Sequence, residues 1–415
     1  MVGRAFSLSI DILPLGLKNS CIFLPWGEKL YIINYMKRAL QAQVQADLKE
    51  KMVFLGGPRQ VGKTTLAQAL GPPEAYLNWD FPFDKKKILS LELPPTKLWI
   101  FDEIHKYKLW RNLIKGIYDK NKNQHQILIT GSARLDLLRR GGDSLQGRYH
   151  YLRLYPITLD ELRSDKQSDL MDLIHKSGFP EPFLSEGKMD AQRWSHEYRH
   201  RILKDDIQSV EVISDLSAAE HLLINLPEKV GSPLSINSLR EDVSVSHKAI
   251  TRWLDIFERF YAIFRLPPMS SSKIRAVKKE KKHYHYDWTL IDDPGIRFEN
   301  LVAVHLLSHV HQLQDVEGED INLCYFRDTD KREVDFVVTR KNKPVLFIEC
   351  KLADQPVSDH LIYLSKKFPQ VPSFQIHLQG AKEYINKDKI QVLAARNFLS
   401  KSLKAILSET HIISK

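Results

Sequence analysis

The sequence predicts an α/β protein, and three observations lead to this fold class. The apolar run at residues 52–55 has the length and composition of a buried strand. It leads into a complete GxxxxGK[ST] match at residues 57–64 (GPRQVGKT), and residues 65–70 then have the composition of a helix. Further apolar runs alternate with helical segments, which is typical of a parallel sheet with crossover helices.

The glycine-rich loop at residues 57–64 predicts a binding site for ATP, because it lies between a strand and a helix. Its glycines allow backbone N–H groups to turn inward around phosphates, and the helix N-terminus adds partial positive charge. Lys63 is expected to reach the β- and γ-phosphates, and Thr64 to bind Mg²⁺. The residues expected to contact the nucleotide are Gly57, Pro58, Arg59, Gln60, Val61, Gly62, Lys63, Thr64 and Thr65.

Two acids end the apolar run at residues 98–101, which is the Walker B pattern. Asp102 is expected to bind Mg²⁺ through water, and Glu103 to polarise the attacking water as a general base. The alternative is a buried strand followed by a solvated acidic turn. The phosphate-binding loop about forty residues upstream favours the catalytic interpretation.

A third apolar run, residues 126–132, ends where a further catalytic strand is expected. Ser132 or Thr130 is predicted to contact the γ-phosphate or the attacking water, and a plain strand cap is the alternative. An arginine that neutralises charge in the transition state is also expected, in cis or from a neighbouring subunit. The candidates are Arg134, Arg139, Arg140 and the preferred Arg148, each of which is otherwise a surface arginine.

Composition limits the class of protein. The 415 residues allow two to four domains, and the formal net charge of +10 favours a polyanionic partner, nucleic acid first and an anionic membrane surface second. Three scattered cysteines indicate neither a disulfide framework nor a zinc site, so a cytoplasmic location is expected. No apolar run has the roughly 18–20 residues of a membrane span.

Residues 1–35 show no clear periodicity and no signal-peptide cleavage site. Two interpretations are open. The segment is either a poorly packed N-terminal extension or upstream sequence translated from a misplaced start.

Residues 236–257 have the pattern of a helix-turn-helix, with the turn and N-cap at 244–246. A strand at 260–266 would follow, as in a winged helix. DNA contacts are expected from the second helix, at His247, Lys248 and Arg252, and a helical packing module is the alternative. A basic run that would add phosphate contacts, or would form a solvated loop, contains Lys273, Arg275, Lys278, Lys279, Lys281 and Lys282.

Four residues near the C-terminus have the pattern of a PD-(D/E)xK nuclease. Asp335 lies in a predicted strand, and Glu349 and Lys351 end the next one. Asp335, Glu349 and Glu299 are predicted to bind Mg²⁺, and Lys351 to activate the water. A charged sheet edge would contain the same residues, and a nuclease-like domain need not cut.

Taken together, the chain resembles prokaryotic AAA-type ATPases with a winged helix and a C-terminal PD-(D/E)xK nuclease-like domain. The resemblance covers residues 36–399 and departs mildly from the family at 287–290 and at Cys350. It rests on the motifs at 57–66, 101–105 (FDEIH), 128–132 (LITGS), 147–148 (GR), 155–157 (YPI), 178–182 (GFPEP), 298–302 (FENLV) and 333–336 (EVDF).

The resemblance implies an AAA-like ATPase core with a helical region, a winged helix and a restriction-endonuclease-like α/β domain. It implies ATP and Mg²⁺ as ligands and, for related members that act on DNA, remodelling of duplex or branched DNA as rings. The expected domains are 36–160 (ATPase), 161–225 (helical), 226–290 (winged helix) and 291–400 (nuclease-like), with a tail at 401–415.

The predicted function is ATP hydrolysis that drives processing of duplex or branched DNA. Two alternatives are open. One is a signal-transducing nucleotide switch that binds a protein partner, and the other is a DNA nuclease gated by ATP.

Overall fold

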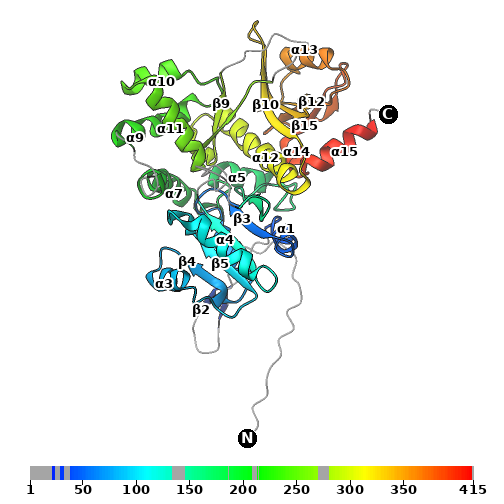
Figure 1. Cartoon of the computed structure of the whole chain (residues 1–415). Helices are drawn as coiled ribbons and strands as arrows, with labels where there is room; N and C mark the ends of the chain where they lie inside the picture. The colour runs from blue at the N-terminus through cyan, green and yellow to red at the C-terminus, as the bar shows by residue number, and fades with distance from the viewer. Residues whose placement is uncertain are drawn as a thin grey trace. The chain divides into compact units, whose positions relative to one another are not determined.

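The computed structural model describes residues 21–23, 29–31, 38–132, 145–185, 187–207, 213, 215–269 and 280–413. The chain divides into two units, residues 1–38 and residues 39–415. In the first unit, β1 (Cys21–Phe23) pairs antiparallel with β2 (Lys29–Tyr31), and most of the predicted extension lies outside the described residues. Figure 1 shows the elements of the second unit.

The first part of the second unit contains a five-stranded sheet with the order β4-β5-β6-β3-β7, in which every neighbouring pair is parallel. The predicted parallel sheet with crossover helices is therefore confirmed. The strands are β3 (Met52–Gly56), β4 (Tyr76–Asn78), β5 (Leu98–Asp102), β6 (Gln126–Gly131) and β7 (Tyr149–Arg153). The helices are α1 (Gln41–Asp47), α2 (Lys63–Gln68), η1 (Pro73–Ala75), α3 (Pro82–Ser90), η2 (Ile104–Lys106) and α4 (Trp110–Asn121).

Strands β3 and β5 are buried along their whole length, because helices cover both faces of a parallel sheet. Helix α4 supplies Trp110, Ile114 and Ile117, whose spacing places them on one face against the sheet. The ring of Phe54 stacks on Tyr149 of the neighbouring strand, with 4.2 Å between ring centroids. This core fixes the carboxyl ends of the strands, where the loops of the site begin.

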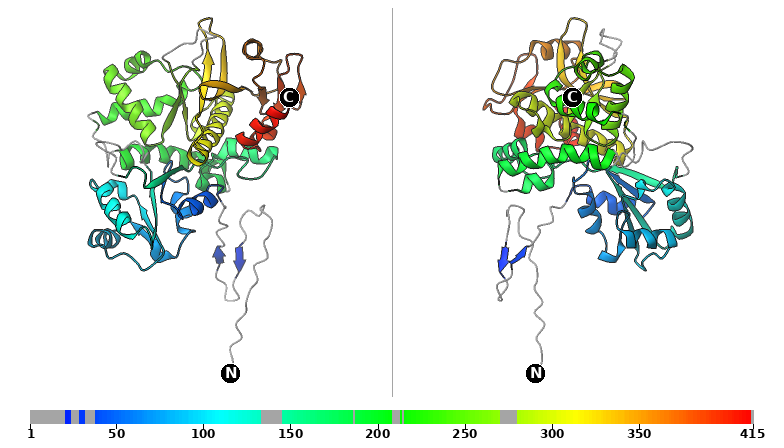
Figure 2. Two further views of the ribbon diagram at one scale, coloured as in Figure 1. Left: turned by 45° about the vertical axis from the view of Figure 1, so that its right-hand side comes forward. Right: turned by 90° about the vertical axis from the view of Figure 1, so that its left-hand side faces the viewer.

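A helical segment follows the sheet, and its helices α5 and α7, labelled in Figure 1, lie between the sheet and the C-terminal part, as the views of Figure 2 also show. Its elements are α5 (Gln167–Lys176), α6 (Pro180–Leu184), α7 (Lys188–Arg201), the π-helix η3 (Ile202–Ile207), α9 (Leu216–Asn225) and η4 (Leu226–Lys229). The short helix α6 begins within the motif at residues 178–182. Gly178 is required there, because a Cβ atom would lie 2.7 Å from the carbonyl oxygen of Ile157.

The two helices predicted at residues 236–257 are confirmed as α10 (Ile236–Val243) and α11 (His247–Arg259). Ser246 caps α11 by accepting a hydrogen bond from the backbone N–H of Ala249. An antiparallel pair, β8 (Ile263–Leu266) and β9 (Lys282–His285), follows, and η5 (Trp288–Leu290) leads into the last part of the chain.

The C-terminal part pairs helix α12 (Pro294–Glu317) with a six-stranded mixed sheet of order β10-β11-β12-β13-β15-β14. The strands are β10 (Ile321–Arg327), β11 (Glu333–Arg340), β12 (Lys343–Lys351), β13 (Ser373–His377), β14 (Tyr384–Ile385) and β15 (Gln391–Ala394). The remaining helices are α13 (Asp359–Lys367), α14 (Ala395–Leu399) and α15 (Leu403–Ile413).

Two further findings concern the ends and surfaces of this part. The segment predicted as a C-terminal tail, 401–415, contains helix α15, which buries Leu403, Ile406 and Leu407 and contacts α12. Within the described ranges, no helix is long and apolar enough to cross a membrane.

The buried imidazole of His305 joins the segment after β7 to α12. Its Nε2 accepts a hydrogen bond from the N–H of Leu159, and its Nδ1 donates to the carbonyl oxygen of Leu301. Burial lowers the pKa of His305 to about 4, from an ordinary value of about 6.5. Since the folded pKa is the lower one, this histidine stabilises the fold above pH 6.5 and loses that contribution as the pH falls toward 4.

We therefore expect the free energy of unfolding to fall by up to about 3 kcal/mol between pH 6.5 and 4 because of His305 alone. Denaturant unfolding at several pH values measures this free energy. In His305→Gln, the fall in the free energy of unfolding between pH 6.5 and 4 should be smaller by that amount. His247→Gln, at an exposed position, is the control and should leave the curve unchanged. Equal pH slopes in the wild type and His305→Gln would contradict the expectation.

Candidate nucleotide-binding site

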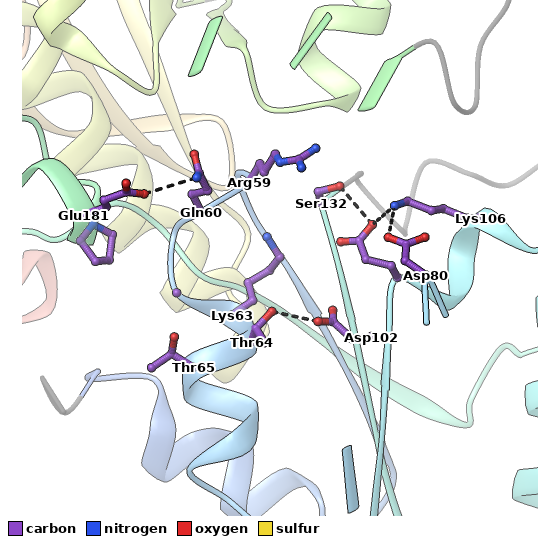
Figure 3. A pocket seen from close by; sticks show the side chains of 13 residues that line it. Arg59, Gln60, Lys63, Thr64, Thr65, Asp80, Asp102, Lys106, Ser132 and Glu181 are labelled. Carbon is purple, nitrogen blue, oxygen red and sulfur yellow. Dashed lines mark hydrogen bonds and ion pairs between the residues drawn. The ribbon is translucent and has the colours of Figure 1, made fainter. Parts of the chain in front are cut away.

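A pocket of about 420 Å³ lies at the carboxyl ends of β3, β5 and β6 (Figure 3). Loops that follow these strands supply most of its walls, as expected for a parallel sheet. The lining residues are Arg59, Gln60, Gly62, Lys63, Thr64, Thr65, Asp80, Asp102, Glu103, Lys106, Ser132, Pro180 and Glu181. The structure thus brings the glycine-rich loop, the two Walker B acids and Ser132 into one cavity.

The glycine-rich loop packs closely against the backbone of Leu154, in the segment that follows β7. Gly57 has a φ of 150°, and a Cβ atom there would lie 2.2 Å from the carbonyl oxygen of Leu154. Gly62 has a φ of 99° and precedes α2. The ammonium of Lys63 donates to the carbonyl oxygens of Gly57 (3.0 Å) and Pro58 (2.6 Å). The loop therefore surrounds a buried cation with its own backbone.

Three hydroxyl groups donate to the buried carboxylate of Asp102. Thr64 Oγ1 lies 2.9 Å from Oδ2, Tyr76 Oη lies 2.6 Å from the same oxygen, and Thr130 Oγ1 donates to Oδ1. Burial and the bond to Asp102 raise the pKa of Tyr76, which keeps its hydroxyl a donor. Figure 3 shows the side chains of Thr64 and Asp102 pointing toward each other. These adjacent oxygens are the hard ligands that Mg²⁺ prefers.

Glu103 faces the same pocket with three polar neighbours. Its Oε2 lies 3.5 Å from Ser132 Oγ, 3.6 Å from Lys106 Nζ and 3.7 Å from His105 Nε2. Burial lowers the pKa of His105, so this ring is neutral at pH 7. The backbone of Glu103 is left-handed, with a φ of 57°, which turns the side chain out of the strand direction. The two candidate sensors are thereby distinguished: Ser132 lies beside Glu103, and Thr130 contacts Asp102.

Several pocket residues were not predicted from the sequence. Lys106 pairs with Asp80 at 2.6 Å, across the opening from the loop (Figure 3). Glu181 accepts hydrogen bonds from Gln60 Nε2 (3.4 Å) and Trp194 Nε1 (3.1 Å), and so links the glycine-rich loop to α7. The signal for Glu181 was its place in the GFPEP motif, to which no chemical role had been given.

Arg148 does not fit its predicted role in cis. In the parallel pair of β3 and β7, Met52 pairs with Tyr149 and Gly56 pairs with Arg153. Arg148 therefore lies at the amino ends of the strands, roughly 15 Å from the glycine-rich loop at their carboxyl ends. Its guanidinium forms two hydrogen bonds with Asp119. Arg134, Arg139 and Arg140 lie outside the described residues.

The predicted C-terminal metal site is also different in the structure. The fully buried ammonium of Lys282 lies among the carboxylates, 2.6 Å from Glu333 Oε1, 3.3 Å from Glu299 Oε1 and 3.7 Å from Asp335 Oδ1. Among the residues that the structure describes, no three His, Cys, Asp or Glu side chains are arranged to hold a metal ion. The prediction that Glu299, Asp335 and Glu349 bind Mg²⁺ stays a prediction, and the ammonium of Lys282 lies against two of these three carboxylates.

The same geometry corrects the prediction for the basic run. Lys282 is unavailable for phosphate contacts, Lys281 is exposed, and the other four basic residues lie outside the described residues.

The predicted catalytic lysine, Lys351, pairs with one of the predicted metal ligands: its Nζ lies 2.8 Å from Glu349 Oε1. Burial, and then the charge of Asp335, raise the pKa of Glu349 to about 8 and that of Glu299 to about 7.

Comparison with family models identifies residues 49–163 as an AAA domain. The sheet, the glycine-rich loop and the Walker B acids lie in this segment, which is an AAA-type P-loop ATPase domain. Residues 167–292 and 294–398 match two domains of unknown function, DUF8612 and DUF4143.

Two relatives and two solved structures are similar to this chain. An uncharacterized protein of Mycobacterium tuberculosis is 24% identical over 365 residues, which are 80% of this chain and 82% of the relative. One of Haemophilus influenzae is 21% identical over 384 residues, or 81% and 91%. A variant of RuvB from Thermotoga maritima has a TM-score of 0.29 at 17% identity, covering 55% of this chain and 89% of its own. A STAND ATPase with a tetratricopeptide repeat sensor, from Pyrococcus horikoshii, has a TM-score of 0.22 at 13% identity, covering 67% and 47%. TM-scores this low do not establish a shared fold.

The close packing of Gly57 generates a prediction about the loop. In Gly57→Ala, the new methyl group meets a backbone oxygen that cannot move away, so the loop must shift at a cost of about 1–3 kcal/mol. If this cost falls on the nucleotide-binding conformation, we expect affinity for a fluorescent ATP analogue to fall by about 5- to 150-fold, since every 1.4 kcal/mol corresponds to a factor of ten.

Gly116→Ala is the matched control. A Cβ atom at Gly116 in α4 meets nothing within 4 Å, so this variant should gain about 0.5–1 kcal/mol of stability and bind the analogue like the wild type. Unchanged affinity in Gly57→Ala would show that the loop tolerates the methyl group.

Proposed function

We propose that the protein binds ATP with Mg²⁺ and hydrolyses it to act on duplex or branched DNA. The observation that carries the hydrolysis is the arrangement at the end of β5: Asp102 contacts Thr64 of the glycine-rich loop, and Glu103 faces the open pocket. A cation-binding acid next to a second, differently placed acid is what ATP hydrolysis requires.

The roles follow from the contacts. Lys63 exchanges its loop carbonyls for the β- and γ-phosphates, because a charged phosphate oxygen is the better acceptor. Thr64 and Asp102 would hold Mg²⁺, and Tyr76 and Thr130 keep the Asp102 carboxylate oriented. A cation bound there would supply positive charge to the phosphates. Glu103 orients the attacking water and takes its proton, with Ser132 beside it.

We expect Glu103→Gln to lose turnover while it keeps nucleotide binding. The amide preserves shape but cannot accept the proton, so turnover should fall about 10²–10⁴-fold with ATP affinity within about threefold of the wild type. A coupled phosphate-release assay measures turnover, and filter binding measures affinity.

Lys63→Ala should instead lose ATP binding itself, since it removes the cation of the loop. Glu92→Gln, an exposed acid outside the pocket, is the control and should turn over ATP normally. Full turnover in Glu103→Gln would remove Glu103 from the mechanism.

Action on DNA is supported by charge and by one exposed helix face. The chain carries a formal net charge of +10, and the first half of α11 exposes His247, Lys248 and Arg252. The order of α10, α11, β8 and β9 fits a winged helix over residues 226–290, and α12 with its mixed sheet fits a restriction-endonuclease-like domain over 291–400. A ring of identical subunits would let Arg148 act on a neighbour's nucleotide, and light scattering with ATP would detect such a ring.

We expect Lys248→Ala to weaken DNA binding equally for all sequences. The slope of the logarithm of affinity against the logarithm of salt concentration should become smaller in magnitude by about one. Lys387→Ala, an exposed lysine in the C-terminal part, removes the same charge elsewhere and should change neither. Fluorescence anisotropy with labelled linear, single-stranded and branched DNA at several salt concentrations measures both quantities.

Turnover with and without the same DNAs separates DNA action from the alternative, a nucleotide switch with a protein partner. Stimulation by DNA supports the proposal. Turnover that is indifferent to every DNA, together with no DNA binding, favours the switch.

A further inference from the structure

The side chain of Lys282 is the starting point for a second proposal. It lies on β9, outside the C-terminal sheet, yet its ammonium is fully buried among carboxylates of α12 and β11. The Nζ–Oε1 distance of 2.6 Å to Glu333 is that of a strong charge-assisted hydrogen bond. The ammonium also lies 5.6 Å from the ring centre of Tyr325, a cation–π contact.

Each acid of this cluster has donors of its own. The carboxylate of Glu299 accepts from Tyr284 Oη at 2.7 Å as well as from Lys282. Glu333 Oε2 accepts from Arg327 at 3.0 Å, and Asp335 Oδ2 accepts from the backbone N–H of Cys350 at 2.9 Å. Lys282 and these donors therefore supply positive charge and N–H or O–H groups to Glu299, Glu333 and Asp335. Glu349 stands apart from them: its Oε1 accepts from Lys351, and its buried Oε2 has no hydrogen-bond partner among the described residues.

A second set of contacts holds β9 in this position. The side-chain amide of Asn300 accepts from the N–H of His285 at 2.8 Å and donates to the carbonyl oxygen of the same residue at 2.6 Å. Together with Lys282 and Tyr284, these bonds attach three of the four residues of β9 to the first turns of α12. The ammonium is thus placed by backbone contacts and does not enter the cluster as a loose surface chain.

We propose that the Lys282 ammonium takes the place of a divalent cation at Glu299 and Asp335, two of the three predicted metal ligands, and joins them with Glu333 in an ion-pair junction between β9 and the C-terminal domain. The junction makes the C-terminal domain a rigid partner of the preceding helices and leaves it without metal-dependent cleavage of DNA. Removal of the ammonium should leave three carboxylates around one cavity, which is the ligand set of a divalent cation site.

Mn²⁺ binding to the nucleotide-free full chain tests this, with every protein carrying Asp102→Asn so that the ATP site does not contribute. The Asp102→Asn protein with Lys282 intact is expected to show no Mn²⁺ binding that depends on Asp335. Calorimetry and the electron paramagnetic resonance of free Mn²⁺ measure this binding. Lys282→Ala is expected to gain one site and to melt at a higher temperature with Mn²⁺ than without it. Lys282→Ala combined with Asp335→Asn should lose both effects.

Lys281→Ala is the matched control, because this neighbouring lysine is exposed. It should behave as the parent protein does. Mn²⁺ binding or Mn²⁺-dependent DNA cleavage that is present with Lys282 intact and lost in Asp335→Asn would overturn the proposal. A folded Lys282→Ala protein that gains no Mn²⁺ site would overturn it as well. If Lys282→Ala does not fold, the protein with Lys282 decides: Asp335-dependent binding overturns the proposal, and its absence supports it.

Discussion

The carboxylate of Asp102 receives hydroxyl groups from α2, β4 and β6, and the nucleotide site depends on this convergence. A charged group taken out of water without partners costs several kcal/mol or more, so the buried acid is stable only where donors meet it. The sheet order β4-β5-β6 brings Tyr76 and Thr130 to either side of it. The backbone pairing of β4, β5 and β6 therefore places the hydroxyl groups that orient the Asp102 carboxylate.

The glycine-rich loop is held by an equally local constraint. Gly56 lies so close to Tyr151 and Tyr261 that a Cβ atom would meet both hydroxyl groups, and these two hydroxyls are 2.9 Å apart. Tyr151 belongs to β7 and Tyr261 follows α11. The backbone just before the loop is thus in contact with the segment that carries the helix-turn-helix pattern, and Glu181 adds a contact on the other side through Gln60.

The sequence was sufficient where function depends on neighbouring residues, and insufficient where it depends on distant ones. The strand, loop and helix around Lys63 and the acids Asp102 and Glu103 could be predicted because each motif is continuous. The location of Arg148 could also have been predicted: a residue that precedes its strand lies at the amino end of a parallel sheet, away from the nucleotide of the same subunit. The buried face of α15 was likewise visible in the spacing of Leu403, Ile406 and Leu407.

The burial of Lys282 could not be predicted from the sequence, for a different reason. It is one of six basic residues in a short run, and nothing nearby in the sequence distinguishes it from Lys281. Its burial is decided by Glu299 and Glu333, which reach it only after α12 and β11 have packed. Charged runs predict solvent exposure on average, and the exception can be found only from the fold.

Helix α12 has a mechanical consequence. Near its C-terminal end, Asp315 pairs with Arg153 of the ATPase sheet, and near its N-terminal end Glu299 and Asn300 hold β9. These points are separated by about 24 Å along one uninterrupted rod. A tilt of about five degrees at the ATPase end would move the other end by about 2 Å, which is the size of helix shift that accompanies switching in proteins. Because α12 is a single continuous helix, a displacement of its end at β7 would displace β9 at its other end.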